Sequence, residues 1–287
     1  MSNHQEARVW ILCARKTRGN SSWTLYRELQ RLGVNCYRVT AGTNPRYSPS
    51  RVHTIINWGV SRPPIWESRL PEDVRWFNTT LAVSISANKR LMQEQLGECG
   101  LPWTHNKFEA ESWIDTGKTV VSRGILNGSQ GRGITLSPPD QLPNAELYTQ
   151  LIEKRDGGSV REYRVYIVDG KAIDITEKRR MRRERREELG IDARDPYTRL
   201  IRAHRNGWVF ARNTMQATAE QCDTIKRCAE VACKTWIGIG GADMIVRYHA
   251  NGEIDDIYTV ETNTQVGISG DGTTAAILAE ALKEVLA

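Results

Sequence analysis

Short apolar runs separated by polar turns dominate the first third of the chain. Three of these runs predict buried strands, at residues 9–13, 34–39 and 52–58. Between the first two, Ser21 and Ser22 are placed to cap a helix that ends at Gly33. The apolar face of this helix carries Leu25, Leu29 and Leu32. Strands that alternate with a helix favour a small α/β unit, to which we assign residues 1–80.

The pattern changes to that of a mixed α+β region after this unit. Ser86 begins a predicted helix that ends near Gly97 and carries Lys89 in its first turn. Five strands are predicted after it, at residues 119–123, 134–136, 147–152, 160–168 and 171–176. Glu153 and Lys154 follow the third of these strands directly. We divide the region into residues 81–155 and residues 156–287.

Two helices are predicted in the last third of the chain. Thr218 and Gln221 have the spacing of a capping box, in which each side chain bonds the backbone of the other residue. The helix that they open has an apolar face, listed as Ile225, Cys228, Ala229, Ala232 and Trp236. Residues 274–286 predict a final amphipathic helix.

A hairpin between these helices carries the candidate chemistry. Asn251 and Gly252 tolerate the positive φ of a tight turn and lie between two apolar runs. Folding there brings Asp243 opposite the neighbourhood of Glu261, and Asn263 points to the same side as Glu261 because side chains alternate along a strand. Two carboxylates and an amide oxygen suit Mg²⁺. The alternative is a solvated hairpin face without a ligand.

A glycine-rich loop precedes this hairpin by about a hundred residues. Asn127-Gly-Ser-Gln-Gly-Arg-Gly133 lies between two predicted strands, and glycines let backbone N–H groups approach a phosphate closely. A mobile hairpin tip has a similar composition. The loop alone therefore leaves both interpretations open.

Composition describes a globular protein without a membrane segment. Of 287 residues, 39% are hydrophobic and 26% charged, the mean hydropathy is −0.51, and no apolar run approaches a membrane span. The N-terminus lacks the pattern of a signal peptide, so we expect a cytoplasmic protein that does not bind membranes. The six cysteines form no Cys-x-x-Cys pair and are expected to be reduced packing residues.

Positive charge is concentrated in one segment. The formal net charge is +6, and residues 178–186 alone carry seven basic side chains. Such a run is most often a solvated helix face. It also suits a polyanionic partner, either a nucleic acid or an acidic peptide.

The order and spacing of these motifs resembles the ATP-grasp superfamily, and within it is most similar to the RimK-type glutamate ligases. The similarity covers residues from about Asn78 to the C-terminus. It implies an α/β fold of the α+β ATP-grasp kind: a small α/β pre-ATP-grasp domain at 1–80, followed by two α+β subdomains that grip ATP between them. Residues 81–155 would form the small lid subdomain with the glycine-rich loop, and residues 156–287 the subdomain with the metal site.

The resemblance assigns most of the polar motifs to ATP. Asp243, Glu261 and Asn263 match the family's metal ligands and imply Mg²⁺, with Mn²⁺ as an alternative. The glycine-rich loop matches a lid over the phosphates, and residues 150–154 match an interdomain hinge that holds adenine. The residues implied in ATP binding are Lys89, Arg123, Gly128, Ser129, Gln130, Gly131, Gln150, Ile152, Glu153, Lys154 and, near the ribose, Glu162.

The resemblance also assigns residues to the reacting groups. Those implied in catalysis are Arg164, Arg212 and Asn213, and those implied on the acceptor side are Arg179, Arg180 and Gly267. Two positions depart from the family pattern. Arg123 stands where lysine is usual, which keeps the charge but changes its geometry. Asn263-Thr-Gln-Val-Gly267 replaces Asn-x-x-Pro-Gly, which loosens the expected turn.

The implied function is that of an ATP-dependent carboxylate–amine ligase acting through an acyl phosphate. It would add an amino acid or similar amine to a carboxylate of a peptide, a protein or a small molecule, and a homo-oligomer would fit the resemblance. One alternative is a ligase that modifies a nucleic-acid-borne group through the basic run at 178–186. A second is a non-catalytic module that binds ATP or nucleic acid, and a third is a kinase that stops at the phosphorylated carboxylate.

Overall fold

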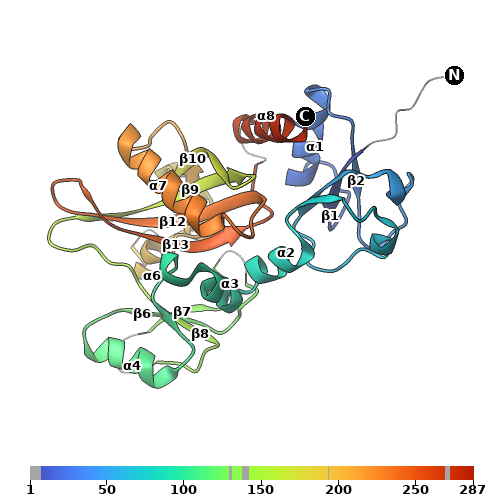
Figure 1. The fold of residues 1–287 in the computed structure, drawn as a ribbon. Coiled ribbons are helices and arrows are strands. Elements are labelled where there is room, and N and C mark those ends of the chain that lie inside the picture. The colour runs from blue at the N-terminus through green and yellow to red at the C-terminus, as the bar shows by residue number, and fades with distance from the viewer. Residues whose placement is uncertain (1–7, 129–130, 138–141, 193, 269–271) are drawn as a thin grey trace.

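The computed structural model describes residues 8–128, 131–137, 142–192, 194–268 and 272–287 (Figure 1). These residues form three sheets, one of five strands and two of four. Of the residues predicted to bind ATP, Ser129 and Gln130 lie outside the described part of the chain.

The N-terminal sheet is parallel and has the strand order β2-β1-β3-β4. Its elements are β1 (Val9–Cys13), α1 (Ser21–Arg31), β2 (Cys36–Val39), β3 (Thr54–Trp58) and β4 (Arg75–Phe77). The predicted strands and helix are present, whereas the short strand β4 was not predicted. The helix is capped one residue earlier than expected, since the side chain of Asn20 accepts a hydrogen bond from the Trp23 N–H.

The second sheet is antiparallel, in the order β5-β8-β6-β7. The elements of this part are α2 (Thr80–Ala87), α3 (Lys89–Leu96), β5 (Trp103–Thr104), α4 (Lys107–Asp115), β6 (Val120–Arg123), β7 (Ile134–Ser137) and β8 (Leu147–Gln150). The predicted helix start at Ser86 was wrong. Asn88 interrupts the helical path, and its side chain accepts hydrogen bonds from the N–H groups of Arg90 and Leu91, so that α3 begins at Lys89.

The third sheet is antiparallel in the order β11-β10-β9-β12-β13. Its part of the chain comprises β9 (Ser159–Val168), β10 (Lys171–Arg180), α5 (Arg183–Glu188), α6 (Pro196–Leu200), β11 (Trp208–Ala211), α7 (Ala219–Cys233), β12 (Ile239–Tyr248), β13 (Ile254–Asn263) and α8 (Thr273–Leu286). The strand β10 continues to Arg180 because its last residues pair with β11. The first third of the basic run therefore lies on a strand, and the expectation of a helix face applies only to α5.

Alternate residues of β9 face two separate cores. Tyr163, Val165 and Ile167 pack with α7 on one face of the sheet. Tyr166 and Val168 point to the other face, where α8 and α1 cover one end. The rest of that second face carries polar side chains, among them Glu162 and Arg164.

The N-terminal sheet and the C-terminal helix share a core. Leu25 and Leu29 of α1 are buried in the same cluster as Leu278 and Leu282 of α8, and Figure 1 shows the two helices side by side. Asn78, with φ of 65°, joins the sheets as well, because its side chain donates to the carbonyl of Ile239 at 2.6 Å and to that of Asn57 at 3.2 Å. Within the described residues, no helix has the length and apolar character needed to span a membrane.

Candidate functional site

Two carboxylates face each other across the β12–β13 hairpin. Asp243 of β12 and Glu261 of β13 are directly paired, as the turn at Asn251 and Gly252 predicted. Asp243 is 3% exposed. The register shifts immediately after Asp243, where a bulge interrupts the ladder. The sequence therefore located the hairpin and its paired acids correctly.

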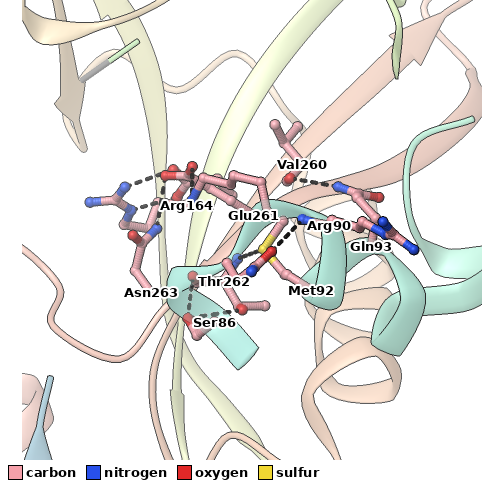
Figure 2. Close-up of polar contacts among 12 residues, drawn as sticks. Ser86, Arg90, Met92, Gln93, Arg164, Val260, Glu261, Thr262 and Asn263 are labelled. Carbon is pink, nitrogen blue, oxygen red and sulfur yellow. Dashed lines mark hydrogen bonds and ion pairs between the residues drawn. The ribbon is translucent and has the colours of Figure 1, made fainter. Parts of the chain in front are cut away.

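Each carboxylate is held by a cation from a different element. Arg164 of β9 binds Asp243 in the bidentate manner, with Nε–Oδ1 at 2.6 Å and Nη2–Oδ2 at 2.7 Å. Lys89, the first residue of α3, places its Nζ 3.0 Å from Glu261 Oε2. Asn263 donates from Nδ2 to Glu261 Oε1 at 3.2 Å, and Figure 2 shows Arg164, Glu261 and Asn263 gathered at this place.

Burial and these partners act on the pKa values in opposite directions. Burial of Glu261 favours its neutral form, but the Lys89 ammonium, together with Arg164 and Asn263, holds the pKa of this carboxyl well below its ordinary value. Burial disfavours the charged form of Arg164, yet the Asp243 carboxylate raises the pKa of this guanidinium above its ordinary value. The site thus keeps Glu261 and Arg164 charged.

Glu162, two residues before Arg164 on β9, behaves differently. It is 7% exposed, and burial raises the pKa of its carboxyl although the Lys178 ammonium opposes this. The nearby charge of Asp243 raises the pKa further. The ion pair with Lys178 therefore favours the ionised form of this carboxyl against its burial.

Helices α2 and α3 fix the end of β13 by hydrogen bonds to its backbone (Figure 2). Gln93 donates to the carbonyl of Val260 at 3.0 Å, and Ser86 donates to that of Thr262 at 2.6 Å. The N–H of Thr262 in turn points to Met92 Sδ at 3.2 Å. These contacts surround Glu261 on both sides and hold Lys89 against it.

The donor set fits a hard divalent cation. Each ionised carboxylate has about four lone-pair sites, so Asp243 and Glu261 can bind a metal while keeping their cationic partners. The amide of Asn263 donates through nitrogen, which leaves its oxygen as a ligand. Among the residues that the structure describes, no group of three or more His, Cys, Asp and Glu side chains could hold a metal. A metal here would therefore rely on two carboxylates, one amide oxygen and oxygens of another molecule.

The glycine-rich loop lies beside this site. It is closed at its base by the Gly124 N–H, which donates to the Gly133 carbonyl at 3.0 Å, and the Lys89 N–H donates to Leu126 O at 3.1 Å. Burial lowers the pKa of Arg123, at the end of β6, although the charge of Glu261 acts on it in the opposite direction. Arg205 donates to the carbonyl of Gly131 at 2.8 Å, so the loop is docked on the segment that follows α6.

A row of cations and aromatic rings extends from Asp243 along the sheet. The Arg164 guanidinium lies 4.2 Å from the centroid of the Phe210 ring, and Lys178 Nζ lies 4.8 Å from the same centroid. Lys178 also forms an ion pair with Glu162. Lys178 was predicted only as part of the basic run at 178–186, and no role was predicted for Phe210. Lys178 and Phe210 are paired across β10 and β11. This pairing could have been predicted only if β10 had been expected to extend past Thr176.

The residues predicted to hold adenine lie at and after the end of β8. Gln150 is the last residue of that strand, and its N–H donates to the Pro102 carbonyl at 3.0 Å. Ile152 is 8% exposed, whereas Glu153 and Lys154 are exposed. Glu153 accepts a hydrogen bond from Thr119 at 3.3 Å. The adenine-binding role of these four residues stays a prediction.

The residues predicted around the reacting groups are spread over several elements. Arg212 forms an ion pair with Asp174 and donates to Thr274 Oγ1 at 2.9 Å, beneath α8. Arg179 binds Glu177 at 3.1 Å and contacts the carbonyl of Thr214. The remaining ones are Arg180, whose Nη1 donates to Thr198 O at 2.8 Å, and the exposed residues Asn213 and Gly267.

Solved structures with the same architecture are ATP-grasp ligases. The ATP-grasp ligase PsnB, complexed with minimal precursor, Mg and ADP, has a TM-score of 0.60 and 13% identity over 99% of this chain and 98% of its own. A Chryseobacterium gregarium RiPP-associated ATP-grasp ligase, in complex with ADP and a leader and core peptide, has a TM-score of 0.59 and 13% identity over 96% of both chains. D-alanine–D-alanine ligase from Bacillus anthracis has a TM-score of 0.56 and 12% identity over 96% of both chains.

These likenesses extend over nearly the whole chain and show its fold. The expectation of an α/β ATP-grasp architecture is confirmed. No family model matches the chain, and no curated protein matches it.

Proposed function

We propose that the protein is an ATP-dependent carboxylate–amine ligase that acts through an acyl phosphate. The observation that carries this proposal is the convergence of Asp243, Glu261 and Asn263 with Lys89 and Arg164 beside the glycine-rich loop. Two carboxylates that are each matched by a largely buried cation can bind a metal–triphosphate without leaving uncompensated charge. The shared fold with ligases solved with ADP and peptides supports the same reaction class.

Each side chain has a role that follows from phosphoryl transfer. The transferred group needs neutralised charge and in-line positioning rather than covalent chemistry from the protein. Lys89 and Arg123 offset negative charge on the phosphates, and the 128–133 lid excludes water that would hydrolyse an acyl phosphate. Arg164 and Arg212 stabilise the oxyanion that forms when an amine attacks. Gln150, Ile152, Glu153 and Lys154 bind the adenine.

Mg²⁺ would be held by Asp243, Glu261 and Asn263, and Mn²⁺ would suit the same oxygens. When bound, it supplies charge neutralisation for the β- and γ-phosphates. Within the ligase class we propose addition of an amino acid or similar amine, as in the RimK-type enzymes, to a peptide, protein or small-molecule carboxylate in the cytoplasm.

The decisive experiment measures ATP turnover after isosteric loss of one metal carboxylate. Glu261→Gln keeps the shape of the side chain but removes its charge, and we expect ADP release with pooled amino acids and peptides to fall about 100-fold or more. Glu253→Gln is the matched control, because this exposed glutamate lies in the turn of the same hairpin. Near-normal turnover by Glu261→Gln would exclude the proposed metal site.

The same assay separates the ligase from its alternatives. A non-catalytic binder would bind ATP but release no ADP with any mixture of amines and carboxylates. A kinase-like enzyme would release ADP without an amine and leave a phosphorylated carboxylate, which product mass identifies. A ligase yields ADP, phosphate and a product whose mass equals the two substrates minus water.

A further inference from the structure

A basic pocket opens where β9 and β10 separate. Their pairing ends at Tyr163 and Glu177; beyond it, β10 continues on β11 alone, while β9 continues on β12 to Ser159. The gap forms a cavity of about 290 Å³. Its cationic lining residues are Arg161, Lys178, Arg179, Arg180 and Arg202, and Trp208 lies among them.

Among the described residues, the five cations of this pocket outnumber the carboxylates that balance them, which are Glu177 in the lining and Glu162, paired with Lys178. The carboxylate in its lining, Glu177, is 1% exposed and already binds Arg179 and the N–H of Gln216. Arg202 donates to the Val160 carbonyl at 2.8 Å and forms no ion pair within the part of the chain that the structure describes. Burial lowers the pKa of Arg202, although the charge of Glu162 opposes this.

One donor in the pocket lining lacks an acceptor. Arg179 Nε is buried and has no hydrogen-bond partner among the described residues. A buried N–H without an acceptor is costly, about 1–3 kcal/mol, and an anion in the pocket would satisfy it. The pocket therefore combines unbalanced charge with an unused donor.

We infer that this pocket binds a carboxylate of an acidic peptide that serves as substrate. The inference rests on the proposed ligase function and names the chemistry of one of its substrates. The cavity is large enough for one Asp or Glu side chain or for a peptide C-terminus. Guanidinium groups bind carboxylates through two parallel hydrogen bonds, which gives this recognition its specificity.

The pocket adjoins the paired carboxylates. Arg180 and Trp208 are paired across β10 and β11, two residues from Lys178 and Phe210, which is about 7 Å along a strand. Trp208 Nε1 donates to Thr198 O at 2.9 Å, and the neighbouring Tyr197 hydroxyl lies 3.3 Å from the Ile134 carbonyl beyond the glycine-rich loop. A peptide anchored in the pocket thus lies beside the glycine-rich loop. It also lies beside Lys178 and Phe210, which lead to Arg164.

The surroundings favour a peptide over a nucleic acid. The guanidinium groups of Arg180 and Arg202 lie 5.3 Å and 5.2 Å from the Trp208 ring centroid, so cations already use the aromatic surface that a base would need. On the exposed helix α5, Arg183 binds Glu187 and Arg185 binds Glu188, which reduces the charge available to a row of phosphates. A second pocket beside this helix, lined by Arg183, Arg186, Glu187, Ile191, Asp192 and Arg194, has carboxylates among its cations.

The test is calorimetric binding of short peptides to the whole 287-residue chain without nucleotide. The probes are acetylated tetraglutamate amide, acetylated tetraglutamine amide and acetylated tetraglutamine with a free C-terminus. We expect the first or the third to bind at least about tenfold more tightly than the amide of tetraglutamine. Tighter binding of tetraglutamate amide assigns the pocket to a side-chain carboxylate. Tighter binding of tetraglutamine with a free C-terminus assigns it to a peptide C-terminus.

Two charge-matched double variants locate the binding. Arg180→Gln with Arg202→Gln should weaken binding of the favoured peptide about tenfold or more, whereas Arg183→Gln with Arg185→Gln should leave it within about twofold. Arg161→Gln is a second pocket variant, useful because it leaves the contacts of Thr198 and Val160 intact. It should weaken binding in the same direction.

Several results would overturn the inference. Equal affinity for all three peptides would do so. An equal loss of peptide affinity in the pocket variants and in the α5 double variant would do so as well. Tighter binding of an oligodeoxythymidylate that depends on Arg183 and Arg185 would assign the basic segment to nucleic acid instead. Because peptide binding is measured without ATP, a protein that binds tetraglutamate but releases no ADP would refute the ligase proposal and leave the pocket assignment standing.

Discussion

At the scale of single residues, Arg164 determines the charge balance of the site. Two of its guanidinium nitrogens are bound by Asp243, which is itself 3% exposed. The sequence predicted both residues as functional, but it did not predict that they bind each other. Their contact requires β9 to lie beside β12, and the order of strands in a sheet does not follow from their order along the chain.

The pairing has a consequence for stability. We expect Asp243→Ala to lower the free energy of unfolding by about 3–5 kcal/mol, because it removes the bidentate partner of the largely buried Arg164. Urea unfolding measures this directly. Adding Arg164→Met to Asp243→Ala should recover part of the loss, and a double variant whose loss equals the sum of the two single losses would show that the residues are not coupled.

At the scale of elements, the signals that worked were local. The Asn-Gly and Asp-Gly turns predicted both long hairpins. In the Asp-Gly turn both residues have positive φ, 51° at Asp169 and 73° at Gly170, whereas in the Asn-Gly turn Gly252 alone does, with φ of 87°. The helix α4 was missed because it lacks an apolar stripe, with Ala110 its one buried residue and Phe108 81% exposed. The extension of β10 was missed because charged residues pair there with a strand whose position only the tertiary structure supplies.

The capping box of α7 makes an element-scale prediction. Thr218 Oγ1 accepts from the Gln221 N–H at 3.2 Å, and Gln221 Oε1 accepts from the Thr218 N–H at 3.0 Å. Thr218→Ala should cost about 1 kcal/mol of stability. Thr224→Ala, at a partly exposed position inside the same helix, is the control and should be neutral or slightly stabilising because alanine favours helix. Thermal unfolding of both variants compares the two positions.

At the scale of the whole molecule, the predicted boundary at residue 80 coincides with the start of α2 but not with a gap between cores. Leu25, Leu29, Leu278 and Leu282 are fully buried in one cluster that reaches from the N-terminal sheet to the five-stranded sheet. Periodicity along the sequence predicted that residues 274–286 form an amphipathic helix, but it contained no information on which element its apolar face would meet. The pairing of Asp243 with Glu261 was easier to predict, because a single hairpin turn places the two residues opposite each other.

The shared cluster predicts that a cavity created in α8 also destabilises α1. Leu278→Ala should lower the free energy of unfolding by about 2–5 kcal/mol and increase amide hydrogen exchange in α1 as well as in α8. Leu81→Ala is the control, because Leu81 is 68% exposed and its truncation creates no cavity. Protection of α1 that stays unchanged in Leu278→Ala would show that the two helices are energetically separate.

The contact between α1 and α8 also bears on how the chain is made. During synthesis the strands of the N-terminal sheet leave the ribosome early, yet the helix that covers the apolar side of α1 is translated long after them. Until α8 emerges, Leu25 and Leu29 lack the apolar contacts that this helix later provides. The nascent protein therefore completes its first unit late in translation, and this interval is when chaperones would protect it.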